Sequence, residues 1–165
     1  MRQILAAVAL IALLFAWKSP GSAQAPASPG AAPVTLPHLV LSADSLDGLP
    51  RRSVTVSGED GRSATYSGVD LGVLLAKHGA PSASTLRGSA LADYVLVRAT
   101  DGYRALFALP ELDATFTDKI VLLADRRNGE PLPAAAGPFQ VVVPDEKHHA
   151  RWIHSVTEID VLASP

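Results

Sequence analysis

Tight-turn signals divide the chain beyond residue 33 into short apolar segments, and this division restricts the fold more than any other feature. Glu59-Asp60-Gly61, Asp101-Gly102 and Asn128-Gly129 are each typical of a tight turn. The segments between such turns favour strands over long helices. We expect strands over residues 34–41, 53–57, 63–67, 94–100, 103–109, 120–124, 139–143 and 156–161. This pattern predicts an α+β fold that is rich in sheet.

Predicted helices and one apolar run refine this prediction. Asp70 is placed to cap a helix that ends at Gly79, and a shorter helix is expected over residues 42–48. The face of the longer helix carries Leu71, Leu74 and Leu75. Pro110 favours one further helical turn. The unbroken apolar run at 120–124 predicts a strand that is buried on both faces.

The N-terminal residues have the three-part layout of a secretory signal. Arg2 precedes an apolar run over residues 4–17, and small residues follow. A membrane-spanning helix needs about 18 apolar residues, and this run is shorter. We therefore expect residues 1–23 to be a signal peptide cleaved after Ala23. The mature protein is then periplasmic or secreted, with no membrane span.

Two regions follow the expected cleavage site. Residues 24–33 are predicted to be a flexible Pro/Ala-rich lead-in, and residues 34–165 a single domain. The signal holds two of the 14 basic residues and none of the 16 acidic ones, which leaves 12 against 16 and a net charge of −4. Nucleic acid and anionic membranes are therefore not expected as partners.

The sequence contains no cysteine. Disulfides, iron–sulfur clusters, c-type haem and thiol catalysis are thereby excluded for these residues. No phosphate-binding glycine loop, zinc-protease motif, hydrolase elbow or dinucleotide fingerprint is present either. Generic motifs therefore identify no catalytic residue.

Histidines and arginines are the remaining candidates for a site. His148, His149 and His154 carry imidazoles, which are common ligands for zinc and copper. Adjacent histidines rarely point the same way, and no carboxylate lies at a helical spacing from them, so we favour a polar loop over a metal site. Arg126 and Arg127 have two interpretations, a solvated pair or two guanidinium groups that hold an anion.

A series of short blocks runs through the second half of the chain. The blocks are Tyr66-Ser67-Gly68-Val69-Asp70-Leu71, Leu74-Leu75, Ala99-Thr100-Asp101-Gly102-Tyr103, Leu122-Leu123-Ala124, Gly129-x-Pro131-Leu132, Gly137-Pro138-Phe139, Val142-Val143-Pro144 and Arg151-Trp152-Ile153. In this order they resemble the molybdopterin-binding domain of the sulfite-oxidase family. The resemblance implies a β-rich mixed sheet domain of the α+β class, in agreement with the strand pattern.

The resemblance also implies a cofactor, and the sequence departs from the family at the metal ligand. In that family the cofactor's dithiolene and one protein thiolate hold the metal, and the cysteine lies upstream of the Gly-Val-x-Leu block. Residues 54–66 occupy that stretch here and contain no cysteine. Ser57 is a poor substitute, because an unactivated hydroxyl is a weak ligand for such a metal. We expect no cofactor and no metal site, although the resemblance alone implies molybdopterin.

The family's pterin-contacting segment has one basic residue, two others, and a basic residue directly before a tryptophan. His148 and Arg151 hold the basic positions here, and Trp152 follows. Family members that carry the cofactor are exported folded, through a twin-arginine leader. No Arg-Arg pair precedes the apolar run of this chain.

These observations favour a non-redox binding module for a small anionic ligand or a periplasmic protein partner, with no catalytic residue. The candidate ligand-binding residues border the family's cleft and are Arg104, Arg126, Arg127, His148 and Arg151. For each of them a solvated surface charge is the alternative. The alternative function is a molybdopterin-dependent, sulfite-oxidase-like oxidoreductase or a subunit of one. Metal binding by the histidines is a third hypothesis.

Overall fold

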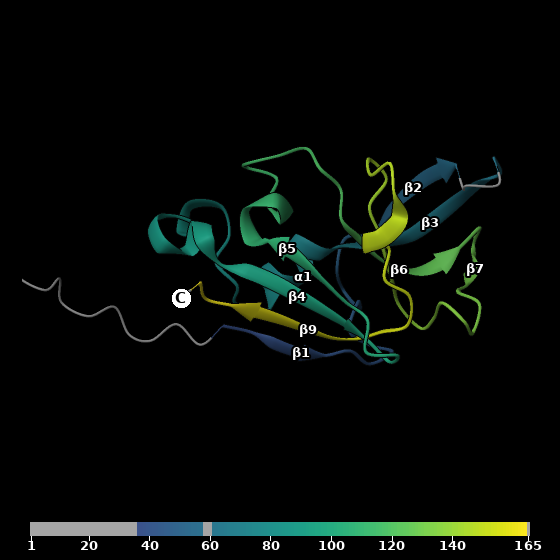
Figure 1. Ribbon diagram of the computed structural model, residues 1–165, viewed down its shortest axis with the longest axis horizontal. Coiled ribbons are helices and arrows are strands. Elements are labelled where there is room, and N and C mark those ends of the chain that lie inside the picture. Colours follow the sequence, from purple (N-terminus) through teal and green to yellow (C-terminus); the bar gives the residue numbers. More distant parts are fainter. Residues whose placement is uncertain (1–35, 58–60, 165) are drawn as a thin grey trace, which may run out of the picture. The chain divides into compact units, whose positions relative to one another are not determined.

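Two β-sheets form the framework of the protein in a computed structural model, which describes residues 36–57 and 61–164 (Figure 1). The first, sheet A, has the strand order β1-β9-β4-β5. Its strands are β1 (His38–Val40), β9 (Val156–Leu162), β4 (Tyr94–Ala99) and β5 (Arg104–Ala108). β9 thus lies between two strands that come much earlier in the chain.

The second sheet, sheet B, has the order β2-β3-β6-β7, and β8 also pairs with β6. Its strands are β2 (Arg52–Ser57), β3 (Ser63–Asp70), β6 (Leu122–Arg127), β7 (Glu130–Pro131) and β8 (Gln140–Val142). All strand pairs in the described residues are antiparallel. The sheet-rich α+β class is confirmed, with antiparallel sheets where strands of mixed direction were expected.

The predicted hairpins are present because local turn chemistry sets them. β2 and β3 pair on either side of residues 58–60, which lie outside the described part. Asp101 joins β4 to β5, and its Oδ1 accepts a hydrogen bond from the Tyr103 N–H at 2.8 Å. Between β6 and β7, Asn128 and Gly129 have φ angles of 54° and 85°. Asn and Gly adopt this left-handed conformation at the lowest cost, so these residues set the register of the hairpin.

One α-helix, α1 (Leu71–Lys77), is present in the described residues, and it buries the three predicted leucines. Asp70 stands at its N-cap but makes no capping hydrogen bond, so that prediction is wrong. The carboxylate instead pairs with Arg52 on β2, whose Nη1 lies 3.3 Å from Oδ2. The predicted stop is confirmed, since Gly79 follows the helix with a φ of 91°.

The predicted helix over residues 42–48 is wrong. Ser45 and Asp47 donate to carbonyls three residues earlier, at 3.0 Å each, and residues 43–48 form successive turns. Leu46 is the one buried side chain among them. Without an apolar face to pack, the turns do not extend into a helix.

Short 3₁₀ helices supply the rest of the helical structure. They are η1 (Ala83–Thr85), η2 (Gly88–Ala92), η3 (Leu109–Leu112) and η4 (His149–Arg151). The turn predicted at Pro110 is η3. This turn lies directly against α1, because a Cβ atom on Gly72 would stand 1.9 Å from the carbonyl oxygen of Leu112. Only glycine allows the two backbones to approach this closely.

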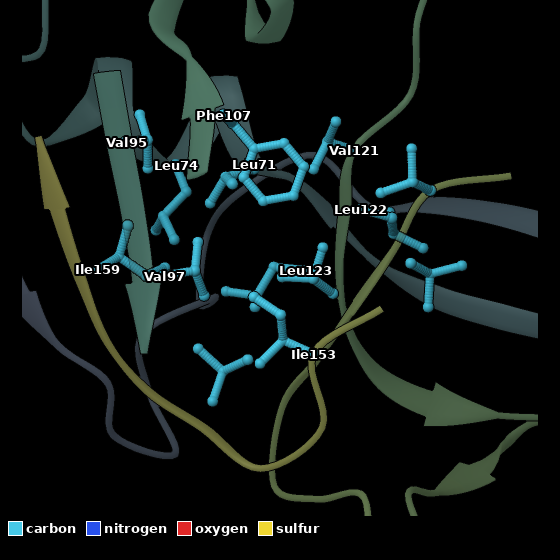
Figure 2. Packing of buried hydrophobic residues seen from close by; sticks show 14 of the residues in the cluster. Leu71, Leu74, Val95, Val97, Phe107, Val121, Leu122, Leu123, Ile153 and Ile159 are labelled. Carbon is cyan, nitrogen blue, oxygen red and sulfur yellow. The ribbon is translucent and has the colours of Figure 1, made fainter. Parts of the chain in front are cut away.

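Both sheets and α1 contribute side chains to one buried cluster (Figure 2). Figure 2 labels Val95, Val97, Phe107 and Ile159 from sheet A, Leu71 and Leu74 from α1, and Leu122 and Leu123 from β6. Leu122 and Leu123 are both fully buried although they leave opposite faces of β6. The prediction that this strand is covered on both faces is therefore confirmed, and the strand runs from Leu122 to Arg127.

The predicted signal peptide, residues 1–23, and the lead-in, residues 24–33, lie outside the described residues. In the part that the structure describes, no helix is long and apolar enough to cross a membrane. The signal and the domain boundaries remain predictions.

Candidate functional site

Four side chains form a continuous row that joins sheet B to the segment before β9. The guanidinium carbon of Arg127 lies 5.7 Å from the centre of the Tyr66 ring. Tyr66 meets Trp152 edge to face, with ring centres 5.9 Å apart. His149 stacks on Trp152 at 3.8 Å. We call Arg127, Tyr66, Trp152 and His149 the aromatic row.

Strand pairing and a hydrogen bond position this row. Tyr66 on β3 and Arg127 on β6 are cross-strand partners, so their side chains leave the same face of the sheet. Trp152 follows η4, and its Nε1 donates to the carbonyl oxygen of Val143 at 3.0 Å. Tyr66 and Trp152 are buried, His149 is half-buried and Arg127 is exposed. The row therefore has a hydrophobic centre and polar ends.

Arg151, next to Trp152 in the chain, belongs to a cluster of ion pairs. Its Nε donates to Glu146 Oε1 at 2.8 Å, and its Nη1 donates to Glu111 Oε1 at 3.0 Å. Lys119 Nζ lies 3.0 Å from Glu111 and 3.6 Å from Glu146. We call Glu111, Lys119, Glu146 and Arg151 the ion-pair cluster.

Burial and pairing act in opposite directions on the charges of this cluster. Burial raises the pKa of Glu111, but hydrogen bonds from Lys119 and Arg151 outweigh it and hold that pKa below its usual value. Burial lowers the pKa of Arg151, but hydrogen bonds to Glu146 and Glu111 outweigh it and raise that pKa overall. Arg151 Nη1 also donates to the carbonyl oxygen of Leu106 at 3.1 Å. The guanidinium group of Arg151 therefore already donates hydrogen bonds to three acceptors of this chain.

Three of the predicted ligand-binding residues lie near the aromatic row. Arg127 forms one end of it. His148 is exposed and precedes His149, which forms the other end. Arg151 lies beside Trp152 in sequence, but its guanidinium is held in the ion-pair cluster.

The other two predicted residues line separate pockets. Arg104 begins β5 and lines an open pocket of about 490 Å³ together with Arg98 and Glu158. Arg126 lines a pocket of about 500 Å³ whose wall includes Phe139. The structure therefore does not bring Arg104 and Arg126 into one pocket.

Arg126 and Arg127 also face different surroundings. They are neighbours on β6, and consecutive side chains of a strand leave opposite faces. Arg126 is paired with Ser67 on β3, whereas Arg127 is paired with Tyr66. The geometry thus separates the two guanidinium groups and does not favour the binding of one anion by both of them.

Several residues of this region carried no signal in the sequence. Glu111, Lys119 and Glu146 come from three separate segments, and no spacing or motif connects them with Arg151. Tyr66 falls within a family block, but only the fold shows that it bridges Arg127 and Trp152. These contacts depend on tertiary structure.

A smaller pocket, of about 250 Å³, lies beside α1 and is lined by Arg52, Asp70 and Asp113 among others. Asp70 Oδ1 is buried and has no hydrogen-bond partner among the described residues. Burial raises the pKa of Asp70, and the nearby Arg52 opposes that shift. Asp113 is already satisfied, because it accepts the Ala83 N–H at 2.6 Å and the Thr115 N–H at 2.8 Å.

The donor atoms of this chain do not fit a molybdenum centre of the sulfite-oxidase type. The sequence contains no cysteine and so no thiolate. Across residues 36–57 and 61–164, no group of three or more His, Cys, Asp or Glu side chains is arranged to hold a metal ion. His149, one of the candidate ligands, stacks on Trp152.

Comparison with known proteins gives the family. The sequence model of one protein family, the oxidoreductase molybdopterin binding domain, matches residues 42–165, which is more than half of the chain. A comparison with curated proteins finds no match. The matched span includes β2 to β9, the aromatic row and the ion-pair cluster. The resemblance predicted from the sequence blocks is therefore confirmed, and the chain belongs to the oxidoreductase molybdopterin-binding domain family.

Proposed function

We propose that this chain is a non-redox binding module, which keeps the family's fold and binds a small anionic ligand. The proposal rests on the protein groups that could bind the metal and its cofactor. The sequence offers no thiolate to hold molybdenum. Arg151, at the basic position before Trp152, is already bound by Glu111 and Glu146. The protein ligand that a sulfite-oxidase centre needs for its metal is therefore missing, whereas the family's fold is kept.

Exposed cations support an anionic ligand. Arg104, Arg126 and Arg127 are exposed and form no ion pair with the described residues. A guanidinium group presents five N–H donors and binds carboxylates and phosphates in a bidentate manner. A periplasmic protein partner that presents a carboxylate would use the same groups.

We also propose that residues 1–23 direct export and are removed, so that the protein acts in the periplasm or outside the cell. The support is the charged start, the apolar run and the small residues near Ala23. A secretory leader delivers an unfolded chain, so a cofactor inserted in the cytoplasm would not travel with it.

Metal analysis of the purified protein tests the non-redox function. We expect no stoichiometric molybdenum in protein isolated from the periplasmic fraction, and no pterin fluorescence after denaturation. We also expect no turnover of sulfite or of a sulfoxide. Stoichiometric molybdenum together with turnover would overturn the proposal and establish the sulfite-oxidase-like alternative, which family membership favours.

A Ser57→Cys variant separates the missing ligand from a missing supply of cofactor. It places a thiol in the stretch where the family carries its cysteine. Expressed in the cytoplasm without residues 1–23, the variant and the parent chain meet the same cofactor pool. Molybdenum bound by Ser57→Cys and not by the parent chain would support the assignment of the missing thiolate. Equal binding by both chains would contradict it.

A further inference from the structure

The Arg126 pocket combines one guanidinium group with an apolar wall. We define it by Arg126, Leu132, Pro138 and Phe139, and its volume is about 500 Å³. Phe139 is 3% exposed, Leu132 is half-buried and Pro138 is exposed, so the apolar wall runs from the core to the surface. Pockets for small molecules are commonly of this size and mostly apolar, with few polar groups.

Arg126 keeps most of its hydrogen-bonding capacity. Its Nη1 donates to the carbonyl oxygen of Gly129 at 3.2 Å, which ties the side chain to the turn between β6 and β7. Among the described residues it makes no ion pair, so its other N–H groups are open to a ligand. The turn therefore orients this guanidinium and leaves its charge unmatched.

The one carboxylate in the pocket is already neutralised. Asp125 is bound through both of its oxygens by Arg51, with Nη1 3.2 Å from Oδ2 and Nη2 on Oδ1. A paired carboxylate repels an incoming anion much less than a free one. The net unmatched charge at the pocket is therefore the positive charge of Arg126.

We infer that the Arg126 pocket binds a small organic anion with an apolar body, of which an aromatic carboxylate is the simplest form. The carboxylate would accept hydrogen bonds from Arg126, and the apolar body would lie against Leu132 and Phe139. This inference rests on the proposed function, because it names the site and the ligand class of that binding module. Arg127 leaves the other face of β6 and takes no part.

Three probes that carry the charge, the ring or both test this inference by amide NMR on the purified, ¹⁵N-labelled protein. Sodium benzoate carries both features, sodium acetate carries only the charge, and benzyl alcohol carries only the ring. We expect benzoate to shift the amide signals of Leu132, Ala134 and Gly137. Acetate and benzyl alcohol should each bind at least about tenfold more weakly, because each lacks one of the two contributions.

Variants in the pocket and outside it supply the test and its control. Arg126→Gln should weaken benzoate binding by about tenfold, and Arg126→Lys should weaken it less. Arg87→Gln removes the charge of an exposed arginine outside the pocket and should leave the affinity unchanged. Arg127→Gln, one residue away on the other face of β6, tests the competing position. Arg126 is exposed, so its variants should keep the amide spectrum of the folded protein.

The outcomes distinguish this inference from the proposed function. Benzoate binding that is lost in Arg127→Gln and retained in Arg126→Gln would overturn the Arg126 pocket and leave an anion-binding module at the aromatic row. Equal binding of benzoate and benzyl alcohol would overturn the anionic class of ligand. No binding of benzoate would also overturn the inference, whereas metal content decides the non-redox function separately.

Discussion

Arg151 and Glu111 lie 40 residues apart in the chain and meet with Nη1 3.0 Å from Oε1. Glu111 belongs to η3, which follows β5, and Arg151 closes η4, which precedes β9. The pair thus ties two 3₁₀ turns together next to Trp152. Arg151, the arginine directly before Trp152, therefore ties two segments of the fold together.

Glu111→Gln should lower the free energy of unfolding at neutral pH by about 1–2 kcal/mol, because Arg151 and Lys119 lose a charged acceptor. The pKa of Glu111 is held below its usual value of 4.5, so its contribution is present above that pH. It is lost as the pH falls through the lowered pKa of the folded state. Urea unfolding at neutral and acidic pH measures this, and the gap between parent and variant should close in acid.

Glu130→Gln is the matched control for that experiment. Glu130 is exposed and forms no ion pair with the described residues. Its substitution should change stability by less than about 0.5 kcal/mol. A loss for Glu111→Gln that is no larger than this, or that persists unchanged in acid, would contradict the ion-pair assignment.

Gly72→Ala should destabilise the protein by at least about 2 kcal/mol, since the new methyl group would overlap the carbonyl oxygen of Leu112. The obstacle is backbone, so side-chain rotation cannot relieve it. Thermal or urea unfolding measures the loss. Val73→Ala, at the next and more exposed position, should cost far less, and equal stability of the two variants would rule out the close contact between α1 and η3.

Asp70→Asn should flatten part of the dependence of stability on pH. Because burial raises the pKa of Asp70, the folded state binds its proton more tightly than the unfolded state does. Stability from this group is therefore present at low pH and is lost as the pH rises above its usual value of 3.8. Relative to the parent chain, the variant should gain stability between acidic and neutral pH in urea titrations. If the variant instead loses stability relative to the parent chain between acidic and neutral pH, the pKa of Asp70 is not raised.

His149→Ala should cost about 0.5–1.5 kcal/mol, because the ring that stacks on Trp152 is removed. In protein without residues 1–23 Trp152 is the one tryptophan, and its fluorescence should change with the substitution. His148→Ala, the exposed neighbour, should alter neither stability nor emission. Identical spectra for the two histidine variants would show that the stacking is absent in solution.

The hairpins could be predicted from the sequence because their chemistry is local. Gly102, Asn128 and Gly129 have the positive φ angles that few other residues adopt, and the Asp101 side chain accepts a hydrogen bond from the Tyr103 N–H. The three leucines of α1 were predicted for a similar reason, since their spacing places them on one face.

Contacts between segments that are distant in the chain could not be predicted from the sequence pattern. Ser42 has the residue type of a helix cap, but such residues also begin isolated turns, and only packing decides between them. Asp70 also has a capping residue type, yet Arg52 on the neighbouring strand takes its carboxylate. The sequence pattern does not relate the candidate arginines to one another, and only the folded chain places them in two pockets, the aromatic row and the ion-pair cluster.

The position of β9 has a consequence for the order of assembly. β9 is the last strand along the described chain, yet it pairs on one side with β1 and on the other with β4. Until residues 156–162 have been synthesised, β1 lacks the one strand with which it pairs in the described part of the chain, and sheet A stays open along its middle. Closure of this sheet is therefore a late, long-range step, which predicts a slow final phase of folding after sheet B has formed.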